Sequence, residues 1–168
     1  MNNRFIKQGL IILFVMSVAA CSDNEVSVEK VVVPVGAVNS VELDVFKSPT
    51  CDCCGRWVSY IDEKGFGATT HHPADLNLVK QKLGIAPQYQ SCHTGVSKEG
   101  YIFEGHVPAD IMQRFLAEKP ENALGLAVPG MPIGSPGMEM GDQRDDYDVL
   151  LLNKDGSAEV YERIRLGV

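Results

Sequence analysis

The chain has 168 residues, a net charge of −7 and 45% hydrophobic residues, which is enough for one modest domain with a hydrophobic core. Its acidic balance argues against a nucleic acid partner and gives no attraction to anionic lipid. The sequence has no Walker-type glycine loop, no Gly-x-Ser-x-Gly and no His-Glu-x-x-His. Nucleotide-binding and hydrolase functions therefore have no support.

The N-terminal segment has the features of a secretory signal. Arg4 and Lys7 precede an almost wholly apolar run at residues 9–18, and small residues follow it. This pattern is typical of a segment that is removed on export. We predict a signal peptide at residues 1–20, which places the mature protein outside the cytoplasm.

The end of this signal is similar to a bacterial lipobox, with Val-Ala-Ala-Cys at residues 18–21. That similarity implies a signal of the lipoprotein type, with cleavage before Cys21 and lipid attached to its sulfur. Ser22 gives no inner-membrane retention signal. We predict a periplasmic lipoprotein held to the outer membrane by its lipid alone, with a tether at residues 21–40.

The remainder, residues 41–168, is expected to form one α/β domain. In chain order we expect a strand at 41–46, a helix from Cys54 to Lys64-Gly65, a strand at 67–72, a helix between Asp75 and Gly84, a hairpin of 94–97 with 101–103, a helix at 109–118, and strands at 147–152 and 159–164. Alternation marks the strands, and a 3.6-residue apolar period marks the helices. This order indicates a thioredoxin-like domain with a mixed sheet and flanking helices.

The first helix is preceded by a dense group of cysteines, Cys51, Cys53 and Cys54, and Cys92 lies further along the chain. Amides and the dipole at a helix N-terminus favour thiolates. Exported cysteines usually form disulfides, but a disulfide between cysteines this close together closes only a short loop and stabilises the fold little. A redox pair or a metal–thiolate site is therefore favoured, and a long-range bridge to Cys92 stays open. Lys47, before the cysteines, is expected on the surface.

Further soft ligands accompany these thiols. His93 follows Cys92, and His106 lies near the next predicted loop. Met131, Met138 and Met140 occupy a loop rich in Pro and Gly, where a core methionine is not expected. Thiolates and thioethers prefer Cu(I), zinc or iron–sulfur species. Bridging thiolates favour a small copper cluster, while one zinc ion or an iron–sulfur centre stays open.

Three motifs together resemble the CopG copper-resistance family. They are Lys-Ser-Pro-Thr-Cys-Asp-Cys-Cys at 47–54 followed by Trp57, Ser-Cys-His-Thr at 91–94, and the loop at 128–141. The resemblance covers residues 41–168. It implies a thioredoxin-like fold, a role in copper tolerance, and a cysteine-bridged copper cluster that interconverts Cu(I) and Cu(II).

The resemblance also implies a ligand set, with several copper ions in each chain. The bridging ligands are Cys51, Cys53, Cys54 and Cys92, and further ligands are sought among His93, His106, Met131, Met138 and Met140. The implied partners are copper ions and other periplasmic copper-resistance proteins. Two alternatives stay open: a thiol–disulfide oxidoreductase that uses Cys51 and Cys54, and a structural zinc module. Whether the protein is an enzyme, such as a copper oxidoreductase, also stays open.

Overall fold

The computed structural model describes residues 40–165, so the predicted signal peptide, Cys21 and nearly all of the tether lie outside the described residues. The described part forms a seven-stranded sheet in the order β2-β1-β3-β4-β5-β6-β7. The strands are β1 Val41–Lys47, β2 Phe66–His71, β3 His93–Ser97, β4 Ile102–Glu104, β5 Ala123–Ala127, β6 Tyr147–Asn153 and β7 Ala158–Ile164. The helices are α1 Asp52–Glu63, α2 Leu76–Lys82 and α3 Ala109–Glu118, with a short 3-10 turn η1 at Pro87–Tyr89. Within residues 40–165, no helix has both the length and the apolar character needed to cross a membrane.

The sheet is mixed, as predicted. β1 runs parallel to β2 and antiparallel to β3, and β3 forms a hairpin with β4. β5 is parallel to β4, and β6 and β7 continue the sheet with antiparallel pairs. The predicted α/β class is confirmed, and the order β1, α1, β2, α2, β3, β4, α3 is consistent with a thioredoxin-like domain.

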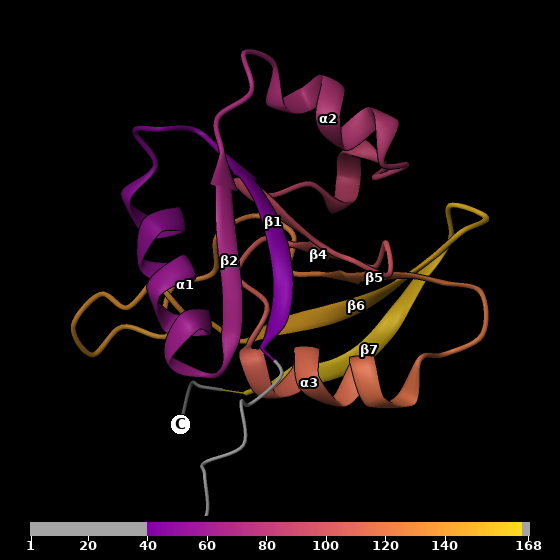
Figure 1. The fold of residues 1–168 in the computed structure, drawn as a ribbon. Coiled ribbons are helices and arrows are strands. Elements are labelled where there is room, and N and C mark those ends of the chain that lie inside the picture. The colour runs from indigo at the N-terminus through magenta and orange to yellow at the C-terminus, as the bar shows by residue number, and fades with distance from the viewer. Residues whose placement is uncertain (1–39, 166–168) are drawn as a thin grey trace, which may run out of the picture. The chain divides into compact units, whose positions relative to one another are not determined.

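Each face of the sheet has its own core because successive strand residues point to opposite sides. Phe103 and Leu126 belong to the larger core, which also contains buried residues of α1 and α3. Their neighbours Ile102 and Ala127 belong to a smaller core with Ile85, just after α2. Figure 1 shows α1 beside β2 and α3 across β7. Helices α1 and α3 therefore cover the face of the larger core, and α2 with η1 covers the opposite face.

Helix α1 is amphipathic and starts inside the cysteine motif. Cys54, Trp57 and Ile61 are each 0% exposed, and their spacing places them on one helical face. The Trp57 indole donates a hydrogen bond to the Val107 carbonyl at 3.0 Å. This bond satisfies the ring's polar atom inside the core. The buried stripe fixes the rotation of α1, and with it the direction of the cysteines in its first turn.

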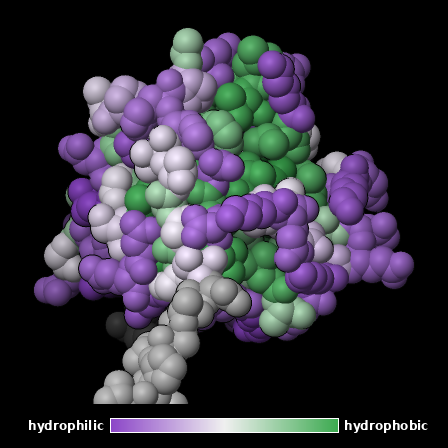
Figure 2. Space-filling view, viewed as in Figure 1, coloured by the Kyte–Doolittle hydropathy of each residue, from purple (hydrophilic) through white to green (hydrophobic). Residues whose placement is uncertain are grey.

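Helix α2 begins as the sequence predicts, because the Asp75 carboxylate accepts a hydrogen bond from the Leu78 amide at 3.0 Å. A side chain in this position satisfies one of the free amides of the first turn. Figure 2 shows apolar residues gathered over α2 on the visible face, and Leu78 is 44% exposed. A groove of about 560 Å³ beside α2 has Leu78, Ile85 and Pro87 in its lining but no cysteine or histidine.

Strand β5 was not predicted from the sequence. Its residues, Ala-Leu-Gly-Leu-Ala, include alanine and glycine, which are depleted in strands. The segment nevertheless pairs with β4 on one side and β6 on the other. Tertiary pairing in the middle of the sheet therefore outweighs the weak local preference.

Candidate metal centre

The two cysteine-bearing segments meet because β1 and β3 are neighbours. Lys47 at the end of β1 is directly opposite His93 at the start of β3. The loop that leaves β1 continues into α1 with Cys51, and Cys92 immediately precedes β3. Antiparallel pairing therefore places the end of one strand beside the beginning of the other. This register brings Cys92 to the first turn of α1.

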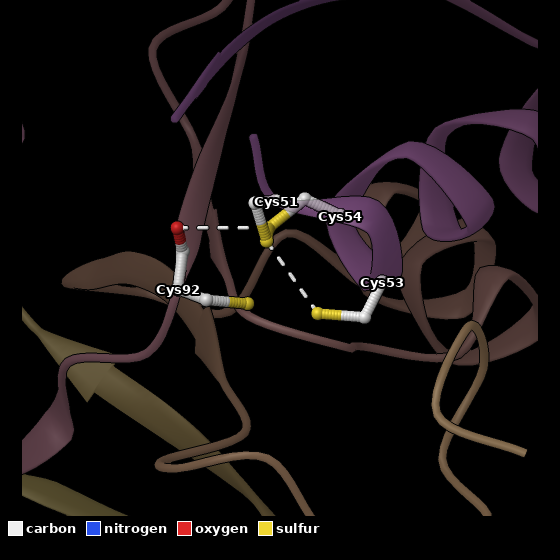
Figure 3. A group of neighbouring side chains, drawn as sticks. All are labelled: Cys51, Cys53, Cys54 and Cys92. Atoms are coloured by element: carbon white, nitrogen blue, oxygen red, sulfur yellow. Dashed lines mark hydrogen bonds between the residues drawn. A yellow bond between two sulfur atoms is a disulfide. The ribbon is translucent and has the colours of Figure 1, made fainter. Parts of the chain in front are cut away.

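Four sulfur atoms form the first ligand group. The Sγ atoms of Cys51, Cys53, Cys54 and Cys92 all lie within 4.8 Å of one another. Figure 3 shows the Cys53 and Cys92 side chains pointing toward each other, below the Cys51–Cys54 pair. Cys51 Sγ lies 3.4 Å from Cys53 Sγ. The structure thus brings together the four cysteines that sequence analysis singled out.

Cys51 and Cys54 form a disulfide, whereas Cys53 and Cys92 are free. The sequence disfavoured a purely structural disulfide and left open both a redox pair of Cys51 with Cys54 and a long-range bridge to Cys92. In this oxidised state the bond joins Cys51 to Cys54, and Cys92 forms no bridge. The first turn of α1 places the Cα atoms of Cys51 and Cys54 5.4 Å apart, which lies inside the usual range for a disulfide. Two thiols remain available in this state, and reduction makes four available.

A second ligand group combines Cys92 with two histidines. One ligand atom from each of Cys92, His93 and His106 lies within 4.8 Å of the others. The Cys92 sulfur lies 3.3 Å from His93 Nδ1 and 3.1 Å from His106 Nε2. Cys92 belongs to both groups. Its sulfur is therefore shared by the four-cysteine group and the cysteine–histidine group.

His106 is held in the tautomer that suits a metal ligand. Its Nδ1 donates a hydrogen bond to the carbonyl of Pro136 at 2.7 Å, because a carbonyl oxygen can only accept. In the neutral ring Nε2 is then unprotonated, and it faces Cys92. Burial lowers the pKa of His106, which favours the neutral ring. An imidazole whose far nitrogen donates to a carbonyl is the usual arrangement of a metal-binding histidine.

His93 carries an unusual polar atom. The residue is 0% exposed, and within residues 40–165 its Nε2 has no hydrogen-bond partner. Burial, and then the nearby charges of His106, Lys80 and Lys47, hold the pKa of His93 well below its ordinary value. A buried polar atom without a partner is costly, and a bound ion is one of the partners that would offset this cost. A neutral imidazole beside a thiol fits a soft metal ion.

Burial keeps the free Cys92 thiol in its protonated form. Burial, reinforced by the negative charge of nearby Cys53, raises the pKa of Cys92 to about 12. The free thiol therefore stays protonated at neutral pH. Metal binding requires the thiolate. A cation in the site compensates the charge that burial otherwise disfavours.

The loop at residues 128–141, which we call the methionine loop, contacts this site through its backbone. Arg56 Nε donates a hydrogen bond to the Gly137 carbonyl at 2.9 Å, in addition to the His106 bond to Pro136. The methionine side chains are less enclosed. Met131 and Met140 are 52% and 53% exposed, and Met138 is half-buried. The centre described here consists of cysteines and histidines, and a ligand role for the methionines stays a prediction.

Three charged residues near the site were missed or misplaced by sequence reasoning. Lys47 was expected on the surface but is 7% exposed, and its ammonium group donates to the Ser48 carbonyl at 2.9 Å. Lys80 and Glu104 are buried as an ion pair next to β3. Of the three, only Lys80 has a sequence position that indicates burial, because it falls on the apolar face of the predicted second helix.

A small α/β domain with a cysteine–histidine cluster at the start of its first helix belongs to the class of thiol-rich metal-handling or redox proteins. A family described as a protein of unknown function, DUF411, matches residues 89–138. A solved structure of copper resistance protein CopG, form 2, is 40% identical, with a TM-score of 0.71 and coverage of 75% of this chain and 99% of that one. The form 1 structure is 42% identical, with a TM-score of 0.69 and coverage of 74% and 98%. No curated protein matches the chain.

This chain belongs to the CopG family. Identity of 40% over 99% of the form 2 structure extends far beyond the cysteine motif. The family resemblance predicted from the three sequence motifs is therefore confirmed.

Proposed function

We propose that this protein binds copper and serves copper resistance, holding Cu(I) in a multinuclear cluster bridged by cysteine thiolates. The observation that carries this proposal is the position of Cys92. Its sulfur lies within 4.8 Å of ligand atoms in both the four-cysteine group and the two-histidine group. One thiolate therefore joins two ligand sets, and Cu(I) accepts bridging sulfur readily.

The ligand chemistry supports copper above harder ions. Four sulfurs and two neutral imidazoles form the donor set, and neither ligand group includes a carboxylate. Soft ligands select Cu(I) and zinc over magnesium or calcium. The two solved relatives carry the name copper resistance protein, which favours copper over zinc.

The Cys51–Cys54 pair supports a change of copper oxidation state as part of this proposal. When these two thiols form their disulfide, they release two protons and two electrons. The two electrons reduce two Cu(II) ions to two Cu(I) ions. Cys53 and Cys92, which remain free, then hold the Cu(I) together with His93 and His106. Thiol–disulfide exchange with a dithiol reductant, which is itself oxidised to a disulfide, returns Cys51 and Cys54 to thiols and completes the cycle.

The site of action in this proposal is the periplasm. The signal-like residues 1–20 and the lipobox-like sequence before Cys21 support export and lipid attachment. Several lipid chains on one cysteine give firm anchoring. Copper then reaches the domain from the periplasm, where other copper-resistance proteins are its expected partners.

The deciding experiment is an anaerobic Cu(I) titration of the reduced full-length chain carrying Cys21→Ser, which cannot be lipidated. Metal analysis and a competing chelator give the number of ions and their affinity. We expect several tightly held Cu(I) ions per chain, and fewer in a Cys53→Ser variant. Zinc in the purified protein and no competition by Cu(I) would overturn the proposal in favour of a structural zinc site.

A second candidate function is thiol–disulfide exchange. The observation in its favour is the Cys51–Cys54 disulfide at the N-terminus of α1, where thiolates are stabilised. A dithiol enzyme reduces a model disulfide such as that of insulin without any metal. Turnover by the metal-free protein, abolished in Cys51→Ser and kept in Cys53→Ser, would establish this function. An inert metal-free protein excludes it.

A further inference from the structure

A buried ion pair lies behind the two-histidine group. Lys80 of α2 and Glu104 of β4 are 1% and 0% exposed, and Lys80 Nζ lies 2.5 Å from Glu104 Oε1. Lys80 also donates to Thr94 Oγ1 at 2.8 Å, and the Thr94 hydroxyl donates to Glu104 Oε2 at 2.5 Å. The three side chains form a closed ring of hydrogen bonds. We call Lys80, Glu104 and Thr94 the buried triad.

A buried ion pair such as Lys80–Glu104 contributes little to the stability of a fold. Taking two charges out of water carries a large desolvation cost, and an apolar pair of similar volume is often as stable or more so. The pKa of Glu104 is raised because burial outweighs the opposing effects of the Lys80 charge and of the hydrogen bonds that the carboxylate accepts. The buried triad therefore calls for a role other than holding the core together.

The buried triad is bonded to the backbone on both sides of two candidate ligands. Glu104 Oε1 accepts a hydrogen bond from the Ser91 amide at 2.6 Å, immediately before Cys92. Thr94 immediately follows His93. The triad thus clamps the segment Ser91–Thr94 at its two ends, with both candidate ligands between them.

The same carboxylate residue also leads directly into the third candidate ligand. Gly105 separates Glu104 from His106 and has φ +75°, and a Cβ added there would lie 2.6 Å from Ser91 Cβ. Its amide donates to the His93 carbonyl at 2.9 Å. The segments that carry Cys92, His93 and His106 are therefore in direct backbone contact at the triad.

We propose that the buried triad is a positioning device that sets the relative placement of Cys92, His93 and His106 for copper. This inference rests on the proposed function. Glu104 belongs to neither ligand group, and its carboxylate is turned to Lys80, Ser91 and Thr94. It acts through the residues that it holds, as outer hydrogen bonds do in metal sites.

The test separates positioning from stability with three variants of the reduced Cys21→Ser chain. Glu104→Gln keeps shape and an acceptor oxygen but loses the charge that fixes Lys80. Lys80→Met keeps the stem and removes the cation. Lys80→Met with Glu104→Leu replaces the ion pair by an apolar pair and so leaves no unpaired buried charge, but it leaves the Ser91 amide without its acceptor and the Thr94 hydroxyl without its two partners. Anaerobic Cu(I) competition and urea unfolding are measured for each.

We expect the double variant to bind one class of Cu(I) roughly 10- to 100-fold more weakly, as outer-sphere changes do, which is a larger loss than a change in stability alone produces in Ile111→Ala. Glu104→Gln should show a smaller loss. The ions held by Cys51, Cys53 and Cys54 should remain. A control, Ile111→Ala in the core on α3, should lose stability and keep its copper affinity.

Three outcomes overturn one or the other of two claims. Parent-like Cu(I) affinity in both Glu104→Gln and the double variant would overturn the positioning role. Affinity that follows stability across all variants, including Ile111→Ala, would also overturn it. Absence of Cu(I) binding by the parent itself instead refutes the proposed function.

Discussion

His106 presents Nε2 to the Cys92 sulfur at 3.1 Å while its other ring nitrogen donates to a carbonyl of the methionine loop. The loop therefore does more than cover the site. It selects the tautomer in which the nitrogen facing the thiol has a free lone pair. An imidazole in that state is ready for a metal ion without a change of tautomer.

The first prediction concerns this imidazole. His106→Gln removes a candidate ligand and should weaken Cu(I) binding at the histidine side of the site by at least roughly tenfold. A loss of about tenfold is the smallest expected when only an outer hydrogen-bond partner of a ligand is removed. The cysteine side should keep its ions. Chelator competition under anaerobic conditions measures both classes.

His71→Gln is the matched control. His71 lies 2.6 Å from Asp44 and its side chain is 41% exposed, and it belongs to neither ligand group. We expect parent-like copper binding in this variant. Equal losses in His71→Gln and His106→Gln would show that general imidazole binding explains the effect.

The second prediction concerns the redox state of the cysteines. Oxidation that forms the Cys51–Cys54 disulfide removes two of the four thiolates, so fewer Cu(I) ions should bind per chain. Anaerobic desalting followed by copper analysis and a thiol count measures the change. A Cys54→Ser variant, which cannot form this bridge, should lose less copper on mild oxidation than the parent.

The location of the cysteine site was predictable from the sequence because few residues determine it. A strand followed by a helix places Cys51, Cys53 and Cys54 in one turn, and close spacing is visible in the chain itself. The approach of Cys92 depends on the pairing of β1 with β3. The predicted hairpin indicated that pairing only indirectly.

The buried charges and the fifth strand were not predictable in the same way. Glu104 and Lys80 are charged, and charged residues are rarely fully buried unless they are paired. Their pairing joins α2 to β4 across 24 residues, a contact that no local pattern reveals. Strand β5 could not be predicted for a related reason, since its alanines and glycine form a strand only because they pair with β4 and β6.

The third prediction concerns acid sensitivity. Burial holds the folded-state pKa of His93 well below the unfolded value near 6.5. Below that pH the unfolded chain binds a proton that the folded chain does not. The free energy of unfolding should therefore fall as the pH drops from 7 to 5, by up to about 1.4 kcal/mol per pH unit from this one group.

Urea unfolding of the metal-free parent and of His93→Gln at pH 7 and pH 5 measures this contribution. His106 has a lowered pKa and Glu104 a raised one, so both also titrate in each protein, and the comparison reports what His93 adds to their shared contribution. The variant should show the shallower loss of stability. An equally steep loss in His93→Gln would mean that His93 does not titrate between the two states.

The last prediction concerns the contact between the methionine loop and α1. Gly137 has φ +82°, and a Cβ added there would lie 2.8 Å from both the Cys53 carbonyl oxygen and the Trp57 amide nitrogen. Gly137→Ala should therefore move the loop and the Pro136 carbonyl that orients His106. We expect a loss of stability of about 1–3 kcal/mol from overpacking, together with weaker Cu(I) binding.

Gly130→Ala separates close packing from backbone strain. Gly130 has φ +71°, and nothing lies within 4 Å of a Cβ added there. Alanine at positive φ carries a similar backbone penalty at both positions, so the excess effect of Gly137→Ala isolates the contact with α1. Urea unfolding and Cu(I) competition of the two variants measure that excess. If Gly130→Ala weakens copper binding as much as Gly137→Ala, the loop acts through its own conformation, and its packing against the cysteine-bearing helix is not what orients His106.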